Sequence, residues 1–387
     1  VKQKPVVDAE PGEPAEETGT ELVVWPENVN SGEAQEKDGP ADAEPETPDT
    51  QKPEGKTDDD TLEASTEQKP VEKAADDDDD DEDVMTFEAN TASTVTKAVN
   101  KAVHNIITII NNCTQKDTTV TIENVNIDVS KKSKAAMSVE GKGDTTLKLE
   151  GNNTLKSGNS HAGVEKNDST SNGKLTITAD STQDSLVASG GSNAAGIGSS
   201  GGKQGTSKLA IEGGTITATG GLYGAGIGGG WGGKAEVTIA GNAVIKKAQG
   251  NYNGAGIGGG GVGNGTVTIS GNAVVEEAVG GTSERGGAGI GGGGWKDGDV
   301  TISGNAKVDA QGGTSAAGIG GGGSGSGTVK ISGNVQVSAK GGKAGDQYKK
   351  YLGDGASIGS GGYSSNNKPT GTPVGGEEIE LDFSDMT

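Results

Sequence analysis

The chain has 387 residues, of which 72 are glycine, 29% are hydrophobic and 3% are aromatic, and its formal net charge is −23. So little apolar material excludes a thick conventional core, and the single cysteine, Cys113, excludes an intramolecular disulfide. The sequence contains no apolar run of roughly 18 residues that would form a transmembrane helix, and no basic face that would favour nucleic acid.

The beginning of the chain differs from the rest in charge and in proline content. Residues 1–88 hold 30 Asp and Glu against 7 Lys, so they carry the whole net charge, while the remaining 299 residues are neutral. Nine prolines lie between Pro5 and Pro70, and none lies between positions 71 and 368. Such a segment cannot bury enough apolar surface to offset its conformational entropy. We therefore expect residues 1–83 to be a disordered acidic spacer.

The next segment, residues 84–118, is expected to cap the folded region. Apolar residues recur every four positions from Val95 to Ile107, behind a Ser-Thr pair that suits a helix N-cap. We therefore expect a short amphipathic helix over 94–107 that covers an open sheet edge, followed by a first strand over 106–110.

Residues 119–366 repeat with a period of about thirty residues. An Ala-Gly-Ile-Gly motif recurs at intervals of 30, 30, 33 and 29 residues, centred on Ile197, Ile227, Ile257, Ile290 and Ile319, with weaker copies at Val164 and Ile358. A second motif, Thr-Val-Thr-Ile-Ser-Gly-Asn, keeps the same spacing and ends its strand at Ile239, Ile269, Ile302 and Ile331, with divergent copies at Ile122, Leu149, Ile177 and Ile211. One copy is therefore one structural unit.

Each copy contains short strands joined by glycine-rich turns. In the segment 266–269, two aliphatic residues alternate with two threonines, which predicts a strand with one buried face. A Gly-Asn turn leads to a second strand at 273–275, and the Ala-Gly-Ile motif supplies a third. Three strands per copy predict an all-β fold, a right-handed single-stranded parallel β-helix of about eight coils stacked ~4.8 Å apart. Residues 367–387 are expected to be a C-terminal linker or the start of a further domain, with a candidate strand at 379–383.

The few aromatic residues cluster around the Ala-Gly-Ile-Gly motifs and suggest a ligand surface. Trp231 and Trp295 follow their isoleucines in the same turn, two coils apart, while Tyr223, Tyr252 and Arg285, the only arginine, precede theirs on consecutive coils. Such rings can stack on the apolar face of a sugar, with Arg285 or the neighbouring Lys296 bonding hydroxyls or carboxylates. The alternative is that the rings fold onto a neighbouring coil.

Two further sets of polar residues recur along the predicted solenoid. Asparagines that follow a turn glycine are expected to stack into a structural ladder of side-chain amides, at Asn242, Asn272, Asn305 and Asn334. Acidic residues in glycine-rich segments are candidate calcium ligands, at Asp297, Asp299 and Asp354.

Three other functions are disfavoured by the same patterns. The G-x-G-x-x-G match at 224–229 recurs once per coil with no helix after it, so it indicates tight turns rather than a nucleotide site. The strand faces carry no compact carboxylate pair, which disfavours a polysaccharide lyase or hydrolase. The threonine column through Thr238, Thr268 and Thr301 is interrupted by Ala210 and Lys330, which disfavours the flat array needed to bind ice.

The units Gly-Ala-Gly-Ile-Gly-Gly-Gly and Thr-Val-Thr-Ile-Ser-Gly-Asn resemble those of a family of bacterial, chiefly Gram-positive, surface β-helix proteins, which are labelled carbohydrate-binding domain proteins. The resemblance covers roughly residues 119–362. It implies a pectate-lyase-like β-helix without lyase activity, and some members bind acidic plant polysaccharide or cellulose and hold structural calcium. We therefore expect a non-catalytic polysaccharide-binding module, secreted or attached to the cell surface. The alternative is an adhesin, a rod that binds a host protein, or a structural stalk that binds no sugar.

Overall fold

The chain divides after Thr66 into two units, Val1–Thr66 and Glu67–Thr387. The computed structural model describes residues 85–89, 98–102, 106–113, 118–167, 173–202, 205–349, 351–363 and 379–382, all in the second unit. The acidic spacer expected over 1–83 lies outside the described residues, as does most of the linker expected over 367–387.

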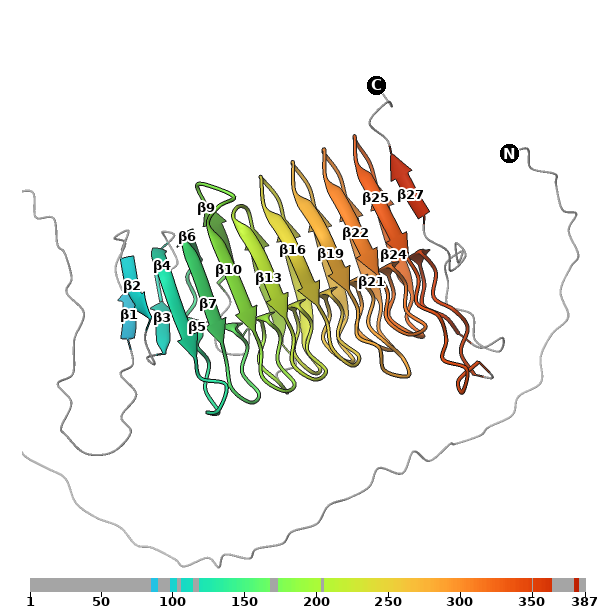
Figure 1. Cartoon of the computed structure of the whole chain (residues 1–387), viewed down its shortest axis with the longest axis horizontal. Coiled ribbons are helices and arrows are strands. Elements are labelled where there is room, and N and C mark those ends of the chain that lie inside the picture. Colours follow the sequence, from blue (N-terminus) through green and yellow to red (C-terminus); the bar gives the residue numbers. More distant parts are fainter. Residues whose placement is uncertain are drawn as a thin grey trace, which may run out of the picture. The chain divides into compact units, whose positions relative to one another are not determined.

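The described part of the second unit is a parallel β-helix of about seven turns, against about eight expected, and it contains no helix (Figure 1). Its strands form a 10-stranded and a 17-stranded sheet. The all-β, parallel architecture expected from the repeat is therefore confirmed.

Each complete turn contributes one strand to the 10-stranded sheet, and the two ends of the solenoid contribute the remaining strands. In order along the solenoid these are β1 (Met85–Ala89), β3 (Ile107–Asn111), β5 (Met137–Glu140), β8 (Val164–Lys166), β11 (Ile197–Gly198), β14 (Ile227–Gly228), β17 (Ile257–Gly258), β20 (Ile290–Gly291), β23 (Ile319–Gly320) and β26 (Ile358–Gly359).

The 17-stranded sheet contains two rows of strands, one after the other along each coil. The first row is β6 (Thr145–Glu150), β9 (Leu175–Ala179), β12 (Thr206–Ile211), β15 (Lys234–Ile239), β18 (Gly265–Ile269), β21 (Gly298–Ile302) and β24 (Gly327–Ile331). The second row is β7 (Asn152–Lys156), β10 (Ser185–Ser189), β13 (Thr215–Thr219), β16 (Val244–Gln249), β19 (Val274–Val279), β22 (Lys307–Gln311), β25 (Gln336–Lys340) and β27 (Ile379–Asp382). The long strand β4 (Thr118–Asp128) pairs with both rows, and β2 (Ala98–Ala102) pairs with β4.

The repeated isoleucines lie in register, which confirms that one sequence copy is one coil. Across the 10-stranded sheet the paired residues are Val164, Ile197, Ile227, Ile257, Ile290, Ile319 and Ile358. All except Ile358, on the last of these strands, are fully buried.

Side chains alternate between the interior and the surface, as the sequence pattern predicts. On β18, Val267 and Ile269 are buried while Thr266 is exposed. Ile257 on β17 and Val275 on β19 are the other large aliphatic side chains that this coil contributes to the core. The core is therefore thin, and each coil gains its stability by stacking on its two neighbours.

One expected alignment is shifted by two residues. From the sequence, Leu149 should lie beside Ile177, but Leu147 pairs with Ile177 and Leu149 pairs with Ala179. Because side chains alternate with a period of two, this shift leaves every side chain on its original face. The burial pattern is therefore the same in both registers, and the sequence pattern does not distinguish them.

The capping helix expected over 94–107 is wrong for the described part of that range. Ala98–Ala102 is strand β2, parallel to β4, and Ile107 already begins strand β3, close to the first strand expected over 106–110. The edge of β4 offers backbone hydrogen-bond partners to an incoming strand and would offer none to a helix. Sheet extension therefore overrides the local four-residue spacing. At the other end, β27 pairs antiparallel with β25 and covers its edge.

The 10-stranded sheet becomes narrower along the solenoid. Its strands shorten from five residues in β3 to three in β8 and to an Ile-Gly pair from β11 onward. At Gly258 the backbone φ is 131°, and a Cβ atom would lie 2.0 Å from the Gly291 carbonyl oxygen of the next coil. Glycine is therefore required at this position. Because these strands are only two residues long, the loops before and after them lie close together. The amide of Gly261, in the loop after β17, donates to the carbonyl of Tyr223, in the loop before β14.

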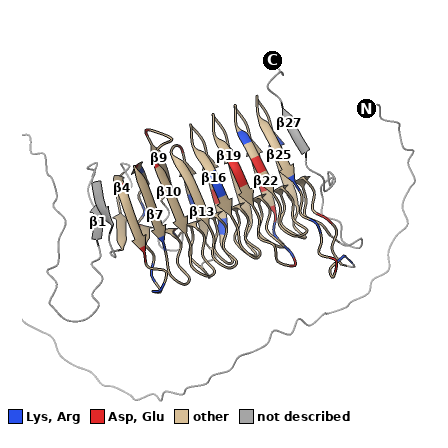
Figure 2. Cartoon of the chain, in the orientation of Figure 1, with Lys and Arg blue, Asp and Glu red and all other residues tan. Residues whose placement is uncertain are grey.

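Surface polar residues connect neighbouring coils. The amide of Asn272 donates to Asn242 at 3.2 Å and accepts from Asn305 at 3.0 Å, and Asn334 follows the corresponding turn glycine of the next coil. On the second row, the basic strand β16 lies beside the acidic strand β19, and Lys247 bonds Glu277 at 2.8 Å (Figure 2). These contacts favour one register between coils.

Candidate functional site

The residues expected to bind sugar lie in the loops on either side of the narrow 10-stranded sheet. Tyr223 and Tyr252 precede β14 and β17, Arg285 precedes β20, and Trp231 and Trp295 follow β14 and β20. These five residues are called the aromatic strip below. They lie on three consecutive coils, the ones that also hold β16, β19 and β22 (Figure 1).

Three rings of the aromatic strip contact one another. Tyr223 packs edge-on against Tyr252, with ring centroids 4.7 Å apart and an interplanar angle of 67°. It also contacts Trp231 at 6.3 Å and 46°. Tyr223 is half-buried between them, whereas Trp231 and Tyr252 are 49% and 45% exposed. The rings therefore fold onto neighbouring coils while Trp231 and Tyr252 stay partly exposed to solvent, and the ring planes are tilted rather than coplanar.

Arg285 and Trp295 form the second part of the aromatic strip. The guanidinium carbon of Arg285 lies 5.4 Å from the centroid of the Trp295 ring, a cation–π contact. Its Nε donates to Ser324 Oγ at 3.1 Å, and one terminal nitrogen donates to Glu284 at 3.4 Å. The guanidinium is thus held in place, while Trp295 remains 43% exposed.

The buried residue Asn253 joins the two parts, and sequence reasoning did not single it out. Its side-chain amide donates to the Arg285 carbonyl at 2.6 Å, and its own carbonyl accepts from Gly294 at 2.7 Å. The Ser283 amide donates to the Tyr252 carbonyl at 2.9 Å. Hydrogen bonds between coils therefore fix the position of the Arg285–Trp295 pair relative to the tyrosines.

Three residues of the aromatic strip have left-handed backbone conformations. Tyr223, Tyr252 and Trp295 have φ of 69°, 53° and 63°, which costs a non-glycine residue roughly 1–2 kcal/mol. Val262 and Ser324 adopt similar angles in the corresponding turns, so the fold tolerates this strain without requiring an aromatic side chain. The aromatic side chains are therefore not explained by the turn geometry.

The candidate calcium ligands are not brought together. Asp297 accepts a hydrogen bond from the Ser326 amide at 2.7 Å, and Asp354 accepts one from the Ala344 amide at 2.8 Å, so both carboxylates support turns. Asp299 is exposed on β21. Among the described residues no three His, Cys, Asp or Glu side chains form a group that could hold a metal ion. Lys296 is half-buried in the turn after β20.

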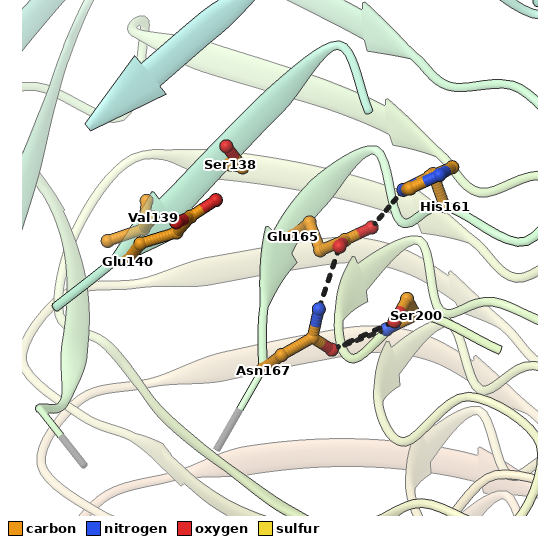
Figure 3. Close-up of a pocket in the computed structure, with 7 residues that line it drawn as sticks. All are labelled: Ser138, Val139, Glu140, His161, Glu165, Asn167 and Ser200. Atoms are coloured by element: carbon orange, nitrogen blue, oxygen red, sulfur yellow. Dashed lines mark hydrogen bonds and ion pairs between the residues drawn. The ribbon is translucent and has the colours of Figure 1, made fainter. Parts of the chain in front are cut away.

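A small open cavity with a mixed polar and apolar lining lies nearer the N-terminus, where the 10-stranded sheet begins to narrow, and sequence reasoning did not find it. It measures about 240 Å³, and its polar lining comes from Ser138, Glu140, His161, Glu165, Asn167 and Ser200 (Figure 3). Hydrogen bonds run from His161 to Glu165 at 2.8 Å, from Asn167 to Glu165 at 2.7 Å and from the Ser200 amide to Asn167 at 2.9 Å.

Comparisons with protein-family models, with curated proteins and with solved structures found no match to this chain. No helix in the described part of the chain is long and apolar enough to cross a membrane. The fold defines a β-solenoid repeat protein with two polar or aromatic surface features, the aromatic strip and the cavity beside β8.

Proposed function

We propose that the chain is a non-catalytic polysaccharide-binding module that acts outside the cell, secreted or attached to a surface, and that the aromatic strip is its binding site. One observation carries the proposal. Four of the ten aromatic residues, together with the only arginine, gather on consecutive coils, and three of their rings are nearly half exposed. Half-exposed rings next to a fixed guanidinium suit sugars, which have an apolar ring face and polar edges.

The extent of the aromatic strip along the solenoid axis determines how long a ligand must be to contact all of it. Trp231 and Trp295 lie in turns two coils apart, which places them ~10 Å apart along the solenoid axis. A single sugar ring does not span that distance. The ligand of this proposal is therefore an extended chain of several sugars that runs along the axis, across the strands.

The side chains of the aromatic strip favour binding over bond cleavage. The rings supply apolar faces that lose water when a sugar stacks on them, and Arg285 supplies donors for a hydroxyl or a carboxylate. The acid next to this guanidinium, Glu284, is bonded to it. Several contacts of this kind, each weak, add up to affinity only when they are made together, which supports recognition of long chains rather than of free monosaccharides.

Replacing both Trp231 and Trp295 with alanine should weaken glycan binding at least about tenfold, because the two rings on which a sugar would stack are lost. The circular dichroism spectrum should stay unchanged, because neither ring belongs to the core. Binding is measured on a polysaccharide and oligosaccharide array, with and without calcium. Tyr351→Ala serves as the control, since Tyr351 is exposed but lies outside the aromatic strip.

Two results would contradict the proposal. One is an intact protein that binds no glycan on the array, and the other is a double variant that binds as well as the parent. Capture of a protein ligand by the solenoid, with no sugar bound, would favour the adhesin alternative.

A further inference from the structure

One exposed aromatic residue outside the aromatic strip lies in the same turn of the coil as the two tryptophans. Tyr363 is 38% exposed and follows the isoleucine of β26 by five residues, just as Trp295 follows the isoleucine of β20. Trp231 follows the isoleucine of β14 by four residues. These three residues, Trp231, Trp295 and Tyr363, are called the stacking row below.

A repeated backbone hydrogen bond holds these turns in equivalent positions. In every coil from β14 to β26, the residue four positions after the isoleucine donates its amide to the loop before the strand of the preceding coil. The donors are Trp231, Gly261, Gly294, Gly323 and Gly362, and the acceptors are the carbonyls of Asn193, Tyr223, Asn253, Gly286 and Ser315, at distances between 2.6 and 2.8 Å. Trp231 is itself a donor, and Trp295 and Tyr363 each follow one directly. The stacking row therefore follows one side of the solenoid from coil to coil.

The stacking row has one member in every second coil. Its members follow β14, β20 and β26, and the order of the 10-stranded sheet places β17 and β23 between these strands. The two intervening turns carry Val262 and Ser324 at the position of Trp295 and Tyr363, so no ring lies there. The aromatic rings therefore repeat every ~10 Å along the axis, over ~19 Å in total.

This spacing suits one class of polysaccharide. In an extended chain of β-1,4-linked sugars each ring advances the chain by ~5 Å, nearly the ~4.8 Å between coils. Successive rings are turned over relative to each other, so every second ring presents the same face in the same direction. Aromatic residues two coils apart therefore meet identical ring faces. An α-1,4-linked chain coils instead, and it cannot lay its rings on all three members of a straight row.

We propose, on the basis that the aromatic strip binds glycan, that Tyr363 is a third stacking position of that site and that the ligand is an extended β-1,4-linked chain. The first, third and fifth sugars stack on Trp231, Trp295 and Tyr363, so about five sugars cover the stacking row. The sugars between them pass the smaller side chains of Val262 and Ser324. Each stacked ring adds to affinity because all three contacts are made by one chain.

Tyr363→Ala should reduce the number of sugars that contribute to affinity. Dissociation constants are measured for the full chain with β-1,4-linked oligosaccharides of glucose, of mannose and of N-acetylglucosamine, each in lengths up to about six sugars. In the parent protein, affinity for the series that binds should rise up to about five sugars and then level off. In Tyr363→Ala it should level off at about three sugars, which leaves the five-sugar chain bound about tenfold more weakly and the three-sugar chain unchanged.

Two variants and a second oligosaccharide series serve as controls. Tyr363→Phe keeps the ring and should bind as the parent protein does. Tyr351→Ala removes a tyrosine that is 58% exposed between β25 and β26 but lies outside the stacking row, so it should leave the length dependence unchanged. The α-1,4-linked oligosaccharides of glucose, in the same lengths, should show no gain of affinity with length.

Three results would overturn the proposal. These are an unchanged length dependence in Tyr363→Ala, α-1,4-linked chains that bind as tightly as β-1,4-linked ones, and a parent protein that binds glycan but none of the three β-1,4-linked series. If the double variant of Trp231 and Trp295 has lost glycan binding in any of these cases, the aromatic strip remains the site and only the third position or the linkage is wrong. A parent protein that binds no glycan overturns the proposed function, and this inference with it.

Discussion

Gly258→Ala should destabilise the solenoid by about 3–5 kcal/mol, although it adds only one methyl group. The new Cβ would lie 2.0 Å from the Gly291 carbonyl oxygen, and the backbone φ of 131° is one that L-residues rarely adopt. Neither coil can move away without breaking the parallel pairing between β17 and β20. Urea denaturation measures the loss, and hydrogen exchange should show protection lost first at β14, β17 and β20.

Gly202→Ala is the matched control for this substitution. Gly202 also has a positive φ, 74°, but a Cβ there would meet nothing within 4 Å. It therefore carries the conformational strain without the collision, and we expect a cost of roughly 1–2 kcal/mol. If the two substitutions lowered the free energy of unfolding equally, the close contact between coils at Gly258 would add nothing to the cost of the positive φ.

Val267→Asp should be at least as damaging, with an expected cost of about 3–5 kcal/mol. Val267 is 1% exposed and points into the solenoid, where a carboxylate would have no water and no basic partner among the aliphatic residues of the core cluster. The cost should be smaller in acid, where the carboxyl can be neutral. The fall in the urea midpoint at pH 7 and at pH 4 measures both effects.

Thr268→Asp tests which face of β18 is buried. Thr268 is the next residue along the strand and lies on the outer face between Thr238 and Thr301. Because its side chain reaches water, we expect a loss below about 1 kcal/mol. A loss as large as that of Val267→Asp would contradict the assignment of inner and outer faces.

Much of the fold could be predicted from the sequence, because a solenoid repeats its packing requirement in every coil. The spacing of Ile197, Ile227 and Ile257 gave the length of one coil, and the alternation around Val267 gave its buried face. The strand β2 could not be predicted in this way, because its apolar spacing also fits a helix and only the free edge of β4 decides between the two. The two-residue shift between β6 and β9 could not be predicted either, because it leaves the same side chains buried.

For the candidate sites, the sequence predicted which residues take part in the aromatic strip but not their geometry, and it did not predict the cavity. Tyr223, Tyr252 and Arg285 could be assigned to one side of the solenoid from their distances to the repeated isoleucines, but the tilt of the rings and the contact between Arg285 and Trp295 depend on loop geometry that periodicity does not describe. The cavity beside β8 had one signal in the sequence. Glu165 pairs with Gly198, so a carboxylate stands where later copies have glycine, and His161 is four residues away.

The central claim, that the aromatic strip is one continuous glycan-binding surface along the solenoid axis, is tested most directly by NMR of the three indole N–H groups. During titration with a polysaccharide that the protein binds, the signals of Trp231 and Trp295 should shift together with one dissociation constant, while the signal of Trp25 stays in place. Shifts of only one of these two tryptophans, different constants for the two, or binding that moves neither would contradict the claim.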